Sequence, residues 1–276
     1  MLPFDSANLN HYHLGLYAMT GPLQMLAGIK PDQALLWFSQ FLNGLCGVGV
    51  FLFLDRKVSR QAGFIGMLSA GLFSVFPSWF VNWGRFTQLS AQTILLPAVL
   101  ITWEALTSID NGEKLFSKKS ITELILAGVL NAGVCLLHFR VAVCMLALIL
   151  IICLYELIKS VRKRVGIRNL VARILLIGMI TVVFILPTLI SGLEAYVDQR
   201  AVQATPSQER KLLTEQYYYT HGDRDTVELS KKSAPFLLLG VAGIFMGFFT
   251  RKHRSLSTIL FIWFLCLIGF SQLYRL

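Results

Sequence analysis

The residues best suited to chemistry lie in a short run, Trp83–Gln88, in which one arginine stands among aromatic and amide side chains. A guanidinium binds phosphate in a forked geometry, and aromatic rings can stack on sugar faces. Gly84 lets a ligand approach the backbone, so Trp83, Arg85 and Gln88 are candidate contacts for a sugar phosphate. An aromatic belt at a membrane interface explains the aromatic residues well but explains Arg85 and Gln88 less well.

Two further polar groups are candidates for the same kind of site. His138 and Arg140 form a tight turn between two apolar stretches, where they could bind an anionic headgroup, with the histidine as a proton carrier. The alternative is that Arg140 only extends to lipid headgroups. Gln40 and Asn43 share a face with Ser39 on a third stretch, which fits either a water-filled cavity or hydrogen bonding between helices.

Acids that could act as a general base are few. Asp5 and Asp32 lie in the first 33 residues, and either could deprotonate an acceptor, although a solvated loop carboxylate is the simpler interpretation. Two histidines, His11 and His13, lack a third ligand, and the five cysteines form no C-x-x-C pair, so no metal site is predicted.

These residues must be positioned by apolar helices. Hydrophobic residues make up 55% of the 276-residue chain and charged residues only 14%, compared with about 25% charged in soluble domains. Eight apolar stretches approach the roughly 20 residues that a bilayer requires. We therefore expect an all-α integral membrane protein, a polytopic bundle of about eight spans. The expected spans are 34–54, 62–82, 91–108, 121–137, 141–157, 170–190, 235–249 and 256–272.

Basic residues cluster in every second loop, namely 55–60, 110–119, 159–168 and 251–254, whereas the intervening short loops carry one arginine each. The positive-inside rule places the basic loops in the cytoplasm, with anionic lipid of the inner leaflet as their contact. Arg173 and Glu104, Glu123 and Glu156 lie near those ends and are expected to extend to the interface or to pair there. The net charge of +10 thus indicates topology, and nucleic-acid binding is not expected.

The remaining segments complete the predicted organisation. The segment 12–29 is apolar but contains Gly15, Gly21 and Pro22, so we expect a helix at the outer interface that does not span. We divide the chain into an outer loop tail with this helix (1–33), a six-span bundle (34–191), an extracytoplasmic loop (192–233) and two further spans (234–276).

Two patches of this sequence, Tyr12–Tyr17 and Trp83–Leu89, with Lys30-Pro31-Asp32 between them, resemble prokaryotic members of the C-type glycosyltransferase superfamily. These are multispan membrane enzymes related to protein mannosyltransferases. The similarity extends over roughly residues 8 to 275, although only the patches are motif-like. The family's first span and most of its first outer loop have no counterpart here, so we expect a fragment or shortened protein, with Asp5 as a candidate remnant of the family's catalytic acid.

The resemblance implies a glycosyltransferase-like protein of the prokaryotic plasma membrane. It would transfer a sugar from a polyprenyl-phosphate donor at the extracytoplasmic face. In such a reaction Arg85, with His138 and Arg140, would neutralise the leaving lipid phosphate, and a divalent metal ion could assist. Two other hypotheses remain open at this point: a non-enzymatic carrier for lipids or polysaccharides, resembling a flippase, and a structural membrane subunit.

Overall fold

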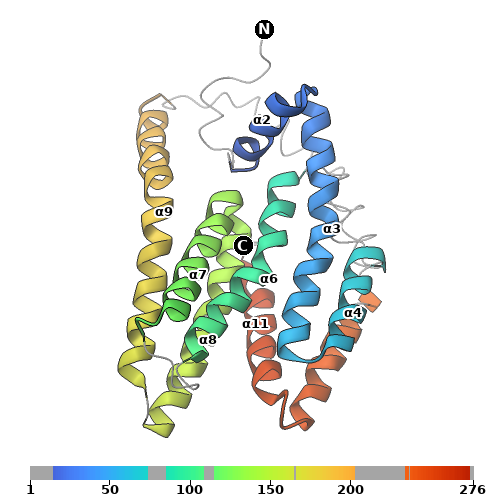
Figure 1. Cartoon of the computed structure of the whole chain (residues 1–276), viewed down its shortest axis with the longest axis vertical. Coiled ribbons are helices and arrows are strands. Elements are labelled where there is room, and N and C mark those ends of the chain that lie inside the picture. The colour runs from blue at the N-terminus through green and yellow to red at the C-terminus, as the bar shows by residue number, and fades with distance from the viewer. Residues whose placement is uncertain are drawn as a thin grey trace. The chain divides into compact units, whose positions relative to one another are not determined.

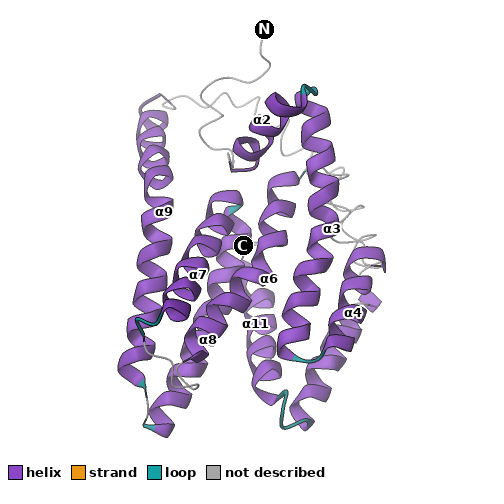
Figure 2. Ribbon diagram, in the orientation of Figure 1, coloured by secondary structure: helices purple, strands orange, loops and turns teal. Residues whose placement is uncertain are grey.

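The computed structural model describes residues 15–73, 85–108, 115–164, 166–202, 234–235 and 237–273. The chain divides into two compact units, one of Met1–Tyr12 with Leu186–Ala242 and one of His13–Ile185 with Gly243–Leu276. The second unit carries most of the described helices and is the bundle discussed below. All regular structure in the described residues is helical (Figure 2), which confirms the predicted all-α class.

The bundle combines short helices in the first part of the chain with longer ones (Figure 1). The elements are α2 (Gly15–Ala27), α3 (Pro31–Lys57), α4 (Arg60–Leu68) with the π-helix η1 (Ser69–Phe73), α6 (Phe86–Thr107), α7 (Lys118–Leu137), α8 (Phe139–Lys163), α9 (Ile167–Val202) and α11 (Arg254–Leu273). Helix α9 extends beyond residue 191, where we had placed the start of a loop, and its last part belongs to the other unit.

Five described helices are long and apolar enough to cross a membrane, which confirms an integral membrane protein. They are α3, α6, α7, α8 and the Ile167–Ile190 part of α9. The other expected spans correspond to shorter helical pieces within the described residues. These are α4 with η1, the apolar helix Leu237–Phe249, and Arg254–Gly269 of α11.

Helix α6 is the centre of the bundle. It packs against α3, α7 and α8, and α11 packs against α8. The most apolar part of α6 is 61% buried, compared with 22% to 44% for the other four spans. Its small residues Ala91, Ala98 and Ala105 are fully buried, so neighbouring helices approach its backbone closely.

Cross-helix contacts fix the direction of each helix. Lys57 at the end of α3 lies over the Trp103 ring near the end of α6, with its Nζ atom 4.2 Å from the ring centroid. Trp103 also hydrogen-bonds Glu156 near the end of α8. Helices α3, α6 and α8 therefore finish together, at what we call the basic end. They begin together at the other end, which we call the Arg85 end.

Two more contacts bring the described basic loops to the same end of the bundle. Arg173, in the second turn of α9, donates a hydrogen bond to the Ala105 carbonyl of α6. Tyr155 of α8 contacts Ser255 at the start of α11, with 2.5 Å between the hydroxyl oxygens. The turns at 58–59 and 250–253, and the residues Arg164 and Gly166, thus all lie at the basic end. This agrees with the alternation of charge along the sequence.

Helix α2 matches the predicted non-spanning helix. It has 13 residues and contains Pro22. At about 1.5 Å per residue it is much shorter than the roughly 30 Å hydrocarbon core of a bilayer. The helix packs against α3, α6 and α7, and Leu16 is completely buried. Because a short turn joins it to the first residues of α3, α2 lies at the Arg85 end (Figure 1).

Candidate anion site at the Arg85 end

The bundle brings three of the predicted site residues to one end. Arg85 is the N-cap of α6, His138 joins α7 to α8, and Arg140 lies in the first turn of α8. Because α6 and α8 run parallel, and α7 returns from the basic end, these residues share the Arg85 end. Arg85 and Arg140 are exposed, whereas His138 and Gln88 are half-buried.

The helix starts at this end lack capping side chains. Helices α3, α6 and α8 have Lys30, Arg85 and His138 at their N-caps, and none of the three makes a side-chain capping bond. The first backbone N–H groups of a helix have no partner within the helix, and they carry the positive end of its dipole. Three such starts beside two exposed arginines make this end suitable for an anion.

Two helices that begin at the basic end, α4 and α7, are built differently. Ser59 caps α4 by accepting a hydrogen bond from the Ala62 backbone N–H at 3.2 Å. Ser117 caps α7 in the same way, accepting from the Ser120 backbone N–H at 3.2 Å. Serine is a preferred N-cap residue, and each cap uses one of the free backbone donors. Helices α4 and α7 therefore have a capping side chain that the starts of α3, α6 and α8 lack.

The polar groups predicted on α3 are only partly enclosed. Ser39 is fully buried and donates to the Leu35 carbonyl in its own helix at 2.7 Å. Asn43 is half-buried, and Gln40 is exposed. The predicted cavity-lining role of Gln40 and Asn43 stays a prediction.

Sequence analysis missed a row of buried hydroxyls on α6, formed by Thr87, Ser90 and Thr93. Ser90 donates to the Phe86 carbonyl at 2.8 Å, and Thr93 contacts the Cys46 thiol at 3.0 Å. Their three-residue spacing in the first half of α6 was the available signal. Ser90 thus satisfies its hydroxyl within α6, whereas the Thr93 contact links α6 to α3.

Some of the remaining predicted site residues lie outside the part of the chain that the structure describes. Asp5 and Trp83 lie outside the described residues. In the described part of the bundle, the acid at the Arg85 end is Asp32, which is exposed in the first turn of α3. The described residues contain no group of three or more His, Cys, Asp or Glu side chains placed to hold a metal ion. We therefore derive no step through a metal.

Comparison with known proteins places the chain in a family. Residues 33–274 match DUF6541, a family of unknown function. The chain belongs to this family. No curated protein and no solved structure matches it. The DUF6541 match begins just before Ala34, so it covers α3 to α11 and omits α2.

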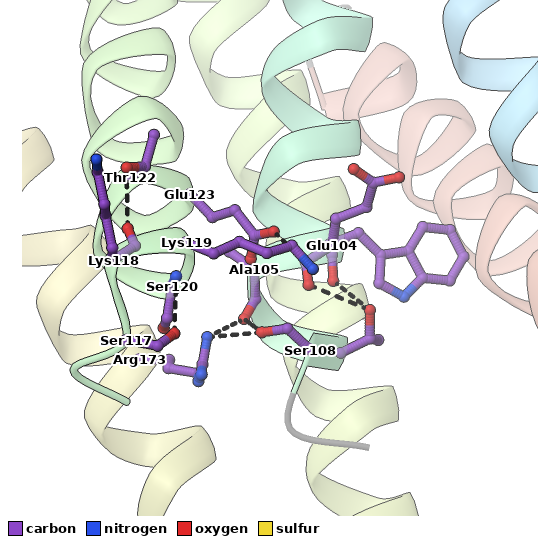
Figure 3. Close-up of polar contacts among 12 residues, drawn as sticks. Glu104, Ala105, Ser108, Ser117, Lys118, Lys119, Ser120, Thr122, Glu123 and Arg173 are labelled. Carbon is purple, nitrogen blue, oxygen red and sulfur yellow. Dashed lines mark hydrogen bonds and ion pairs between the residues drawn. The ribbon is translucent and has the colours of Figure 1, made fainter. Parts of the chain in front are cut away.

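The basic end of this DUF6541 member contains a buried arginine that sequence analysis interpreted wrongly. We expected Arg173 to extend to the interface or to pair there, but its side chain is fully buried inside the bundle. Its Nη1 atom donates to the Ala105 carbonyl at 2.8 Å and to the Ser108 hydroxyl at 2.7 Å (Figure 3). The last carbonyls of a helix lack partners and form the negative end of its dipole, so the guanidinium caps α6.

Glu156 behaves as predicted, because it pairs near its helix end. It is almost fully buried, and its two carboxylate oxygens accept from Trp103 Nε1 at 3.1 Å and from Lys159 Nζ at 2.9 Å. Lys57 covers the other side of the indole. The network joins α3, α6 and α8 at the basic end and leaves the Arg85 end as the candidate binding surface.

Proposed function

We propose that the protein binds a polyprenyl-phosphate-linked sugar at the Arg85 end and transfers the sugar there to an acceptor. The observation that carries the proposal is the convergence of three uncapped helix starts with Arg85, His138 and Arg140 at one end of the bundle. A lipid phosphate can place its charge at this end while its chain stays among the apolar helices. That the lipid phosphate carries a sugar is inferred from the resemblance to C-type glycosyltransferases.

In the proposed reaction an acceptor oxygen bonds to the anomeric carbon as the bond from that carbon to the phosphate oxygen breaks. The electron pair leaves with the lipid phosphate, where Arg85 and Arg140 stabilise the added charge. The acceptor proton passes to a carboxylate, and Asp5 and Asp32 are the candidates for that role. By the positive-inside rule this end faces away from the cytoplasm of a prokaryotic plasma membrane.

The test is the affinity of the purified protein for a polyprenyl phosphate. Arg85→Ala removes a charge-assisted contact worth about 1.5 to 3 kcal/mol, which is roughly tenfold or more in affinity. Arg85→Lys should restore only part of the affinity, because an ammonium lacks the forked donor geometry of a guanidinium. Arg56→Ala is the matched control, since Arg56 is exposed in the last turn of α3 at the basic end. Equal affinities of wild type and Arg85→Ala contradict the proposed site.

Transfer is tested separately by incubating the protein with a labelled polyprenyl-phosphate sugar and looking for release of the lipid phosphate. Release that depends on Arg85 supports a transferase. Tight binding without release, in wild type and in all variants, supports the carrier hypothesis instead. The binding experiment alone separates both hypotheses from a structural subunit.

A further inference from the structure

Beyond this function, we propose that α8 holds an anionic phospholipid at the basic end, with an acyl chain along its exposed surface and the phosphate at Arg162 and Lys163. The first observation is a row of exposed residues at four-residue spacing. Leu146, Leu150, Leu154 and Ile158 are 50%, 59%, 49% and 53% exposed. Arg162 is the next residue of the same row and is also exposed.

Residues four apart on a helix are neighbours on its surface, so this row forms a continuous apolar ridge that ends in a guanidinium. The opposite face of α8 is occupied by protein, because Met145, Leu148 and Ile152 are buried in the core. The ridge therefore faces the lipid side of a helix whose other side is fixed. An acyl chain fits four aliphatic side chains, and a phosphate fits the arginine at their end.

The second observation is an excess of cations without acidic partners. Arg162, Lys163, Arg164 and Arg168 lie within seven residues and are all exposed. In the part of the chain that the structure describes, none of these four forms an ion pair with an acid. Nearby basic residues do have partners, since Lys159 binds Glu156 at 2.9 Å and Lys119 lies 3.8 Å from Glu123. The end of α8 therefore carries a local positive charge that attracts an anionic headgroup.

The backbone keeps these cations together. Arg164 is the C-cap of α8 and has the left-handed conformation, with φ of 53°. Its backbone N–H donates a hydrogen bond to the Val161 carbonyl. Helix α9 begins at Ile167, close to Arg164 in the sequence. The last carbonyls of α8 carry the negative end of its dipole, which favours cations at this position. Basic residues near a membrane surface attract anionic lipids by about 1 kcal/mol each.

The experiment uses the full chain in neutral detergent and measures binding of fluorescent phosphatidylglycerol. Arg162→Gln with Lys163→Gln should weaken binding about tenfold or more. The matched control is Arg251→Gln with Lys252→Gln, which removes the same two residue types from another exposed turn at the same end. This control should change the affinity by less than about threefold if the site is on α8. Leu154→Ala with Ile158→Ala should also weaken binding.

Three outcomes overturn the proposal. Equal weakening by the two double variants means a diffuse basic surface. Equal affinity for phosphatidylcholine means that the phosphate contact contributes nothing specific. Competition by glycerol phosphate at the same concentration as the lipid means a site for a free phosphate, without a role for the ridge. Failure of the proposed function is measured by polyprenyl-phosphate binding to Arg85→Ala, and failure here by phosphatidylglycerol binding to the α8 variants, so the two are distinguishable.

Discussion

The indole of Trp103 donates a hydrogen bond to Glu156 Oε1 at 3.1 Å, although the two residues are separated by 53 positions in the chain. Both side chains are almost fully buried. Lys159 binds the second carboxylate oxygen, and Lys57 lies over the indole ring. A buried carboxylate is stabilised only when its oxygens are satisfied. The contact therefore joins the ends of α6 and α8 and makes each depend on the other.

We predict that Glu156→Ala lowers stability more than Glu156→Gln does. The alanine variant leaves the Trp103 N–H without its acceptor, whereas glutamine keeps a carbonyl oxygen there. Hydrogen bonds to charged groups contribute about 1.5 to 3 kcal/mol, so Glu156→Gln should cost up to about that much. Thermal melting of the purified protein in detergent measures both effects.

The matched control for this pair is Glu104→Gln, because Glu104 is only half-buried at the same end of the bundle. It should change the melting temperature little. A melting temperature for Glu156→Ala equal to that of wild type would show that the network is dispensable.

We predict that Arg173→Ala is among the more destabilising single substitutions in the bundle. The change leaves the Ala105 carbonyl and the Ser108 hydroxyl without their charged donor, at a cost of about 3 kcal/mol or more. Arg173→Lys should recover part of the lost stability, because an ammonium can donate to one of the two acceptors but lacks the forked geometry of a guanidinium. Arg168→Ala is the control, since Arg168 is exposed on the same helix. Arg168→Ala melting at or below the temperature of Arg173→Ala would contradict the capping role.

The sequence predicts much of this fold because its strongest signals are local. Apolar length predicts the five long spans, and the alternation of basic loops predicts which turns share an end. The capping role of Arg173 could not be predicted, because it depends on where the end of α6 lies against α9. The hydrogen bond between Trp103 and Glu156 could not be predicted either, because it depends on where the end of α6 lies against α8. Proximity of Arg85 and His138 at one end follows from counting spans, but their contacts with a ligand do not.

The orientation of the bundle can be tested with single cysteines in a background in which the five native cysteines are replaced by alanine. We predict that a membrane-impermeant reagent added outside intact cells modifies Arg140→Cys. It should not modify Lys163→Cys or Lys252→Cys until the membrane is permeabilised, because these residues lie in the basic turns. Labelling of Lys163→Cys and Lys252→Cys from opposite sides would be incompatible with the arrangement of α8 and α11.

Two glycines on α7 provide a matched test of how closely α7 and α9 pack. A Cβ atom on Gly128 would lie 2.5 Å from Ile180 Cγ2 and 3.4 Å from the Ile177 carbonyl oxygen, whereas a Cβ on Gly133 would meet nothing within 4 Å. The Thr181 hydroxyl also donates to the Gly128 carbonyl at 3.3 Å, so the two backbones must stay close. Gly128→Ala should therefore force the helices apart.

We predict that Gly128→Ala destabilises the protein by about 1 to 3 kcal/mol, the usual cost of overpacking. Gly133→Ala should be neutral or stabilising by up to about 1 kcal/mol, because alanine is the better helix former. Both variants add one methyl group to the same helix, so their difference isolates the contact with Ile180. Ile180→Val should restore part of the stability that Gly128→Ala loses. A double-mutant cycle measures this coupling between the two positions. Equal melting temperatures of the two glycine variants would mean that α9 does not pack on Gly128.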